Sequence, residues 1–179
     1  MMDDICAHII DIAANSHAAG AKNIFVSIEL SKARNLLSLK ISDNGKGMDK
    51  ETAARVVDPF YSTKTGRKVG LGIPLLKGTA ETCGGSFTLS SSAGVGTEIE
   101  AAFLLDHPDL PPLGKLKDTI LILSVSNPEV NFSFEIKTDE SDFLFDTGEI
   151  NKILDGLPIY NPEVIKFLTN YLDENLEFI

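Results

Sequence analysis

The stretch that decides the fold is Leu37-Ser-Leu-Lys-Ile-Ser-Asp-Asn-Gly-Lys-Gly47. Its first six residues alternate strictly between apolar and polar, which predicts a half-buried β-strand. Asp43 follows at the end of that strand, and the two glycines allow the backbone to pass close to a flat ring. A carboxylate there can accept hydrogen bonds from an amino group such as the exocyclic amine of adenine. An ordinary turn explains the same residues, because Asn-Gly is a strong turn signal.

The segment Asp11-Ile-Ala-Ala-Asn15 lies upstream, on a helix predicted over Asp4–Ala19 from the helical spacing of its apolar residues. Asp11 and Asn15 are four residues apart, so both side chains share one helix face. A neutral amide oxygen suits Mg²⁺, and a carboxylate one turn away could deprotonate a nucleophile near a terminal phosphate. Taken alone, the pair is explained more simply by a solvated helix face, or by Asp11 as a partner of the helix dipole.

Further downstream, Gly70-Leu-Gly-Ile-Pro74 opens a helix predicted over Ile73–Cys83, which Gly84 and Gly85 terminate. The unpaired N–H groups and positive dipole of a helix start can bind an anion, and Arg67 and Lys68 precede this one. The spacing fits neither the P-loop nor the dinucleotide-binding fingerprint. A plain helix start remains the other interpretation.

Together the segments resemble the ATP-binding domain of the superfamily that groups gyrase B, heat-shock chaperone, histidine kinase and MutL, often called GHKL. The resemblance covers about residues 4 to 104 and depends on the order of the motifs more than on any one of them. The matching motifs are the N box Asp11–Asn15, the first glycine box Asp43–Gly47, the F box Asp58-Pro-Phe-Tyr-Ser-Thr-Lys64, the second glycine box Gly70–Ile73 and the final box Gly94-Val-Gly-Thr-Glu98.

The resemblance implies ATP and Mg²⁺ as ligands and a role for each motif residue. Asn15 would be the Mg²⁺ ligand, Asp43 the adenine acceptor and Asp11 the catalytic base. Thr97 would contact the purine through a water, and the stretch from 61 to 69 would be a short ATP lid. The complete set expected to contact the nucleotide is Asn15, Asp43, Gly45, Gly47, Met48, Lys64, Arg67, Lys68, Gly70, Leu71, Gly72 and Thr97.

The F box and the short lid favour a histidine-kinase-like or serine-kinase-like phosphotransferase with a role in signal transduction. Only ten residues precede Asp11, too few for the helical hairpin that carries the acceptor histidine of sensor kinases, so we expect phosphorylation of a partner protein in trans. The hydrolysing members of the superfamily usually carry Glu where Asp11 stands. An ATP-driven switch or ATPase of the MutL type is the alternative, which the run Asn15-Ser-His-Ala-Ala-Gly-Ala21 favours.

Composition limits the partners. The chain has 179 residues, enough for one ample domain or one domain with a small appendage. Residues 1–104 hold eleven acidic and eleven basic side chains, whereas residues 105–179 hold fifteen acidic and five basic ones, which accounts for the net charge of −10. Such an acidic region argues against nucleic acid and favours either a basic partner surface or simple solubility. Two cysteines, no apolar run of membrane-spanning length and no signal peptide predict a cytoplasmic protein.

The expected fold class is α+β, a two-layer sandwich of the Bergerat ATP-binding type with a mixed sheet and helices on one face. We expect an ATP-binding domain over residues 1–105, a Pro-rich linker over 106–118 and a small acidic extension over 119–179. In the extension, Thr119–Val125 and Phe132–Lys137 are predicted as strands of a hairpin, followed by helices beginning near Asp146 and Asn161 to give a ββαα order. The apolar side of the last helix must pack on its own hairpin, on a partner or on a second copy.

Overall fold

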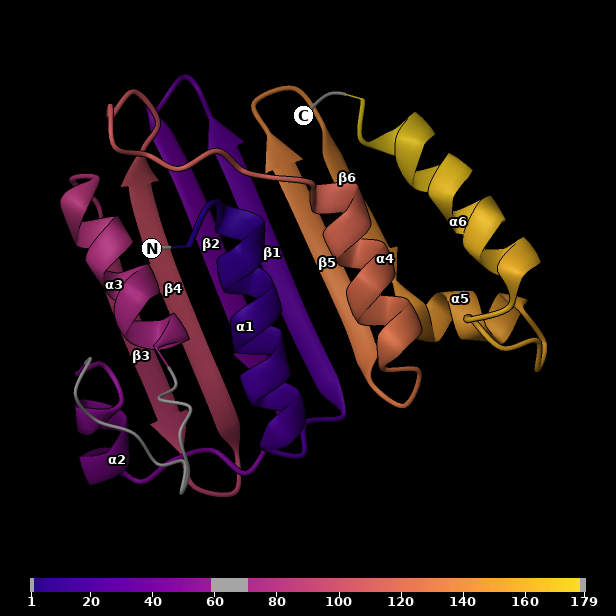
Figure 1. Ribbon diagram of the computed structural model, residues 1–179, viewed down its shortest axis with the longest axis horizontal. Coiled ribbons are helices and arrows are strands. Elements are labelled where there is room, and N and C mark those ends of the chain that lie inside the picture. Colours follow the sequence, from indigo (N-terminus) through magenta and orange to yellow (C-terminus); the bar gives the residue numbers. More distant parts are fainter. Residues whose placement is uncertain (1, 59–70, 178–179) are drawn as a thin grey trace.

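The computed structural model describes residues 2–58 and 71–177 and has a single six-stranded sheet at its centre (Figure 1). Its strand order is β3-β4-β2-β1-β5-β6. The sheet is mixed, because β5 runs parallel to β1 while every other neighbouring pair is antiparallel. The strands are β1 (Asn23–Ser31), β2 (Leu36–Asp43), β3 (Ser86–Ser92), β4 (Gly96–Leu104), β5 (Asn131–Thr138) and β6 (Asp142–Asp146).

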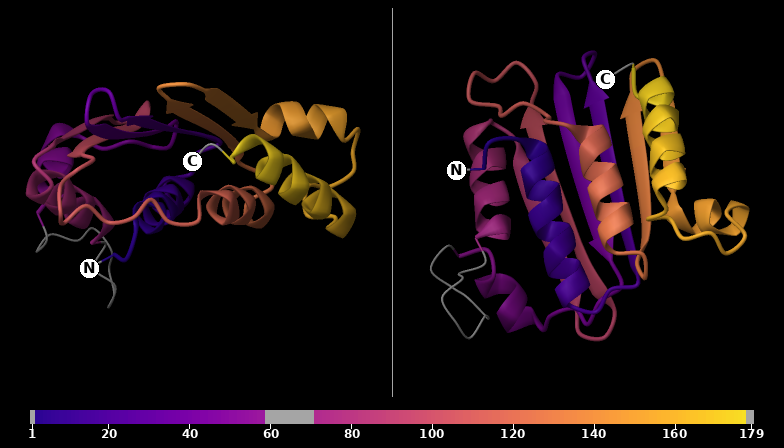
Figure 2. Two further views of the ribbon diagram at one scale, coloured as in Figure 1. Left: turned by 90° about the horizontal axis from the view of Figure 1, so that it is seen from above. Right: turned by 45° about the vertical axis from the view of Figure 1, so that its right-hand side comes forward.

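Helices cover one face of this sheet, as the sequence predicts. The views of Figure 2 place α1, α3 and α4 side by side on that face, and α6 packs against α4 beside the edge strand β6. The helices are α1 (Ile5–Ala18), α2 (Lys50–Arg55), α3 (Gly72–Thr82), α4 (Leu116–Ser126), α5 (Thr147–Ile153) and α6 (Pro162–Asn175).

The alternation of side chains along the strands explains the two layers. In β2, Leu37, Leu39 and Ile41 are buried beneath the helices, while Lys40 and its polar neighbours point to the open face. There the Lys40 ammonium group lies 2.9 Å from carboxylate oxygens of both Glu98 and Glu100 on β4. One continuous apolar core therefore lies between the sheet and its helices.

The predicted strand Thr119–Val125 is wrong, because these residues belong to helix α4. The apolar run is buried along one helical face, through Leu116, Ile120 and Leu123, so its pattern cannot separate a strand from a helix. The topology decides between them: β4 and β5 run in the same direction, and a parallel connection requires a crossover, which α4 provides.

The order of the C-terminal elements is corrected accordingly. After the connection that follows β4, the chain forms α4, β5, β6, α5 and α6, and the hairpin is β5–β6 rather than one around Asn127. Residues 116–118, assigned above to the linker, form the first turn of α4. The predicted starts of the last two helices are confirmed, and both residues are N-caps: Asp146 accepts from the Glu149 N–H and Asn161 from the Glu163 N–H. The division into domains stays a prediction, although β5 and β6 continue the same sheet.

Candidate functional site

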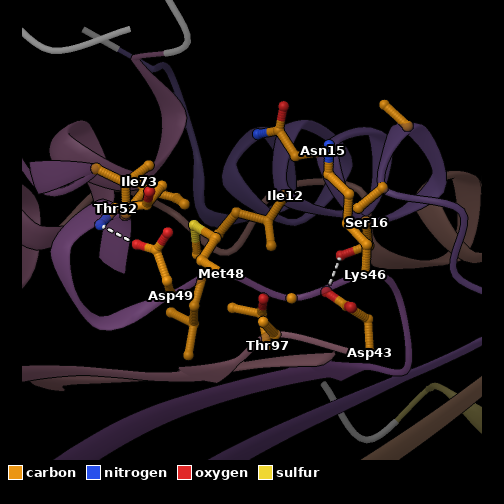
Figure 3. A pocket seen from close by; sticks show the side chains of 16 residues that line it. Ile12, Asn15, Ser16, Asp43, Lys46, Met48, Asp49, Thr52, Ile73 and Thr97 are labelled. Atoms are coloured by element: carbon orange, nitrogen blue, oxygen red, sulfur yellow. Dashed lines mark hydrogen bonds between the residues drawn. The ribbon is translucent and has the colours of Figure 1, made fainter. Parts of the chain in front are cut away.

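A cavity of about 570 Å³ opens where α1 ends over the sheet, between the end of β2 and the start of β4 (Figure 3). Its volume is in the range of small-molecule sites. The segment from the end of β2 to α2 closes one side, and α3 contributes Ile73. The cavity is lined by Ile12, Asn15, Ser16, Ala18, Ala19, Asp43, Lys46, Gly47, Met48, Asp49, Thr52, Val56, Ile73, Ala93, Thr97 and Ile99.

Asp43 is held in a fixed orientation at one end of this cavity. The Ser16 hydroxyl donates to Asp43 Oδ2 at 2.6 Å (Figure 3). The Gly45 N–H donates to Asp43 Oδ1 at 2.8 Å. The two donors bind different oxygens of the carboxylate and so fix the orientation of its plane. The sequence reasoning missed Ser16, although its spacing from Ile9, Ile12 and Ala13 places this polar residue on the buried stripe of α1.

Thr97 belongs to a second network across the floor of the cavity. Its hydroxyl lies 2.9 Å from Ser91 Oγ, which accepts from the Met48 N–H at 2.9 Å and donates to the Gly96 carbonyl at 2.9 Å. Because the single hydroxyl hydrogen of Ser91 is directed at Gly96, the Thr97 hydroxyl donates to Ser91, and the Thr97 oxygen is left as an acceptor toward the cavity. The sequence reasoning missed Ser91 too, although alternation along β3 places it on the same side as Phe87 and Leu89.

Two glycines allow the segment after β2 and the β3–β4 hairpin to approach each other closely beside the cavity. Gly47 has φ +61°, and a Cβ there would come within 2.0 Å of the Ser92 carbonyl oxygen. Gly96 has φ +137°, and a Cβ there would lie 1.9 Å from the Asp43 carbonyl oxygen. Any larger residue would push the first glycine box away from the β3–β4 hairpin, which is pinned to it by the bond from the Gly94 N–H to the Lys46 carbonyl.

The predicted metal ligand and base lie together on α1. Asn15 lines the cavity and donates from Nδ2 to Asp11 Oδ2 at 3.3 Å, which confirms that the two side chains share a helix face. Asp11 is not among the lining residues. Its carboxylate lies against the start of α3, where a Cβ on Gly72 would come within 1.7 Å of Asp11 Oδ2.

The structure thus gathers Asn15, Asp43, Gly47, Met48 and Thr97 around one cavity, with Gly45 behind Asp43. Leu71 and Gly72 stand at the start of α3, Leu71 exposed and Gly72 buried, and neither is among the residues that line the cavity. The remaining predicted contacts, Lys64, Arg67, Lys68 and Gly70, lie outside the described residues, as do most of the F box and the predicted lid.

The sequence reasoning also missed the apolar walls. They are formed by Ile12, Val56, Ile73 and Ile99 together with the predicted Met48. Apolar walls of this kind are typical of small-molecule sites, and Asp43 and Thr97 add the few polar groups that such a site needs to orient a ligand. Ile12 and Ile73 stand inside the N box and the second glycine box, but Val56 and Ile99 stand in no motif, and a wall of a cavity and a wall of the core have the same sequence pattern.

His8 occupies an unusual position one turn before Asp11. It is 1% exposed, and neither ring nitrogen has a hydrogen-bond partner within residues 2–58 and 71–177. Burial lowers the pKa of His8 below its ordinary value of 6.5, against the opposing charges of Asp11 and Asp4. On the opposite side of α1, burial raises the pKa of the Cys6 thiol to about 11.

The fit of a magnesium nucleotide can be judged from these donors. Within the described ranges, no group of three or more His, Cys, Asp and Glu side chains could hold a metal ion by itself. A Mg²⁺ at the Asn15 amide would therefore take its other ligands from phosphates and water, which is how this ion is commonly bound.

Within the described residues, none of the helices combines the length and the apolar character needed to cross a membrane.

Comparison with known proteins identifies the family. Residues 2–107 match the model of the histidine kinase-, DNA gyrase B- and HSP90-like ATPases. The chain belongs to this family. The matched segment is thus an ATP-binding domain of the histidine-kinase-like type, and members of the family generally bind ATP with Mg²⁺.

Curated relatives point the same way. The chain is 29% identical to a putative sensor protein of Shewanella frigidimarina over 109 residues, which are 60% of this chain and 16% of that protein. It is 30% identical to the sensor histidine kinase YvrG of Bacillus subtilis over 97 residues, 52% of this chain and 17% of the relative. The chain therefore matches less than a fifth of the length of these relatives.

Among solved structures, the N-terminal domain of a DNA repair protein superposes with a TM-score of 0.53 at 15% identity, covering 80% of this chain and 52% of the other. A likeness at that identity establishes the fold alone. The α+β sandwich of the Bergerat type, with its mixed sheet and its helices on one face, is thereby confirmed.

Proposed function

We propose that this protein binds Mg-ATP and transfers the terminal phosphate to a partner protein in trans. The observation that carries this proposal is the cavity itself, in which an oriented carboxylate, a neutral amide and a threonine hydroxyl meet between apolar walls. Asp43 and Thr97 would recognise the adenine, and Asn15 would hold the metal. ATP would supply the phosphoryl group that is transferred.

Asp11 is the proposed base. Its carboxylate accepts from Asn15 and lies against Gly72 at the start of α3, which is the end of a helix that attracts anions. A base at that place can take the proton of a hydroxyl acceptor as the phosphate is transferred. A histidine acceptor would need less help, because a neutral imidazole nitrogen is already nucleophilic near pH 7.

The placement of the three histidines of this sequence supports transfer to another protein. His8 is buried and His17 lies within 3.5 Å of Glu129, which belongs to the α4–β5 connection rather than to the cavity. His107 follows the end of β4, at the opposite end of the sheet from Gly96 and the cavity. None of these side chains faces the site in the part of the chain that the structure describes.

The test is transfer of labelled phosphate from γ-³²P-ATP to proteins of a lysate from the native source. We expect a labelled band whose phosphate is acid-labile if the acceptor is histidine and acid-stable if it is a hydroxyl. Asn15→Ala should abolish Mg²⁺-dependent ATP binding, whereas Asn151→Ala, an exposed residue on α5, should bind like wild type. Asp11→Asn should slow transfer and leave ATP binding nearly intact; unchanged transfer would remove Asp11 from the mechanism.

A switch without phosphoryl transfer is the second candidate, and the packing of α1 favours it. This helix carries Asn15 at the cavity and packs against α4 at its other side. A nucleotide that shifts α1 could therefore alter the C-terminal region, provided it binds the two states unequally. If ATP changes the proteins recovered in a pull-down while no protein becomes labelled, the switch replaces the kinase.

A further inference from the structure

The outer side of helix α6 carries aromatic rings that the described residues leave uncovered. Val164, Leu168 and Leu172 form the buried side of this helix. Phe167 is 62% exposed and Tyr171 is 36% exposed, and their rings are stacked with centroids 6.2 Å apart. The Tyr171 ring also contacts the buried Phe143 on the edge strand β6, with ring centroids 5.8 Å apart.

Acidic side chains frame these rings. Glu163 precedes Phe167 by four residues and Glu174 follows Tyr171 by three, so the four side chains share one face of the helix. Both glutamates are exposed. We call Glu163, Phe167, Tyr171 and Glu174 the aromatic face of α6. The surrounding region is equally acidic, since residues 139–179 hold ten Asp and Glu, two Lys and no Arg.

We propose that the aromatic face of α6 docks a basic amphipathic helix of another protein, one that sets Lys and Arg beside two or more apolar side chains. Stacked, partly exposed aromatics supply large contact area at little cost in side-chain entropy. The flanking glutamates attract a basic segment and orient it. Pairing with a second copy is disfavoured, because it would bring the same glutamates together on two chains that each carry a net charge of −10.

This surface is separate from the nucleotide site, so the proposal does not depend on ATP binding. Its contacts come from α6 and β6, whereas α1, β2 and β4 carry residues that line the cavity. Figure 1 shows α6 and β6 at one edge of the sheet, away from β2 and β4. The acidic excess of the C-terminal region would then serve to attract a basic partner segment as well as to keep the protein in solution.

The test uses a fluorescein-labelled peptide of about 18 residues built from Leu and Lys in an amphipathic helical pattern. Fluorescence anisotropy should show binding that weakens between about 50 and about 300 mM NaCl. Phe167→Ala should weaken binding about tenfold or more. Leu144→Ala should not, because Leu144 is 61% exposed but lies between the buried Phe143 and Phe145 and faces the other side of the sheet. A peptide with Glu in place of Lys should not bind.

Amide chemical shifts of the ¹⁵N-labelled wild-type protein give a readout that needs no variant. Shifts caused by the Leu-Lys peptide should concentrate in α6 and β6. Equal affinities of Phe167→Ala and Leu144→Ala, or shifts spread evenly over acidic surface, would overturn the proposal. Sedimentation that reveals a dimer, lost in Phe167→Ala, would assign the face to a second copy and also overturn it.

Discussion

Replacing Ser16 with Ala tests whether the orientation of Asp43 matters for the proposed nucleotide site. The Ser16 hydroxyl is buried and donates to the carboxylate at 2.6 Å. A hydrogen bond to a charged group contributes about 1.5–3 kcal/mol. Asp43 is half-buried and keeps its bond from the Gly45 N–H, so we take the lower end, about 1.5 kcal/mol. If the carboxylate must be preorganised for adenine, the same quantity is lost from binding, and the Kd for ATP rises about tenfold.

The assay is calorimetric titration of ATP in the presence of MgCl₂, with urea unfolding measured in parallel. Ser42→Ala is the matched control, because Ser42 adjoins Asp43 in sequence but faces the open side of the sheet. We expect the Kd of the control to equal that of wild type. A Ser16→Ala protein that is destabilised by about 1.5 kcal/mol yet binds ATP with unchanged affinity would refute the link between this hydrogen bond and adenine recognition.

Three other outcomes follow from the structure. Gly47→Ala should lower the free energy of unfolding by about 2–4 kcal/mol, because a Cβ meets the Ser92 carbonyl oxygen, whereas Gly94→Ala, with positive φ but open space, should cost about 1–2 kcal/mol in urea unfolding. The pKa of His8 is lowered in the folded protein, so below pH 6.5 the unfolded chain binds more protons than the folded one, and the free energy of unfolding should fall as the pH decreases. Urea unfolding should show a weaker fall in His8→Leu. A pH dependence of the unfolding free energy equal to that of wild type would contradict this. Ellman's reagent should label Cys6 and Cys83 only as fast as the protein opens, since both are buried and burial raises the pKa of each thiol.

Local patterns in the sequence predicted the parts of the fold that depend on one buried face. Alternation located β2 at Leu36–Asp43, and helical spacing located α1 at Ile5–Ala18, each to within a residue or so of its predicted bounds. The prediction of a strand at Thr119–Val125 failed because polarity and burial do not coincide in this helix. Ile122 is exposed, whereas Thr119 and Ser124 are buried, so the helical period is not visible in the sequence. The pairing of β5 with β1 joins residues more than a hundred positions apart, and no local pattern contains that information.

The candidate site shows the same limit in a different form. Three residues that line the cavity could be predicted because they stand in motifs with a recognisable spacing: the glycine Gly47, the carboxylate Asp43 and the amide Asn15. Ser16 and Ser91 could not be singled out, because each is one serine among many until the fold directs its hydroxyl to Asp43 or Thr97. Their roles depend on contacts between separate elements, which only the packing of α1 and β3 onto the sheet creates.

Gly72 illustrates why a motif residue needs a physical explanation of its own. The expected reason for glycine in the second glycine box is close approach of a phosphate to the backbone. In the structure another demand is already present: a Cβ at this position would lie 1.7 Å from Asp11 Oδ2, so the Asp11 carboxylate would have to turn away from the start of α3. The proposed base and the proposed phosphate cradle therefore constrain each other, since Asp11 can lie at the start of α3 only because residue 72 has no side chain.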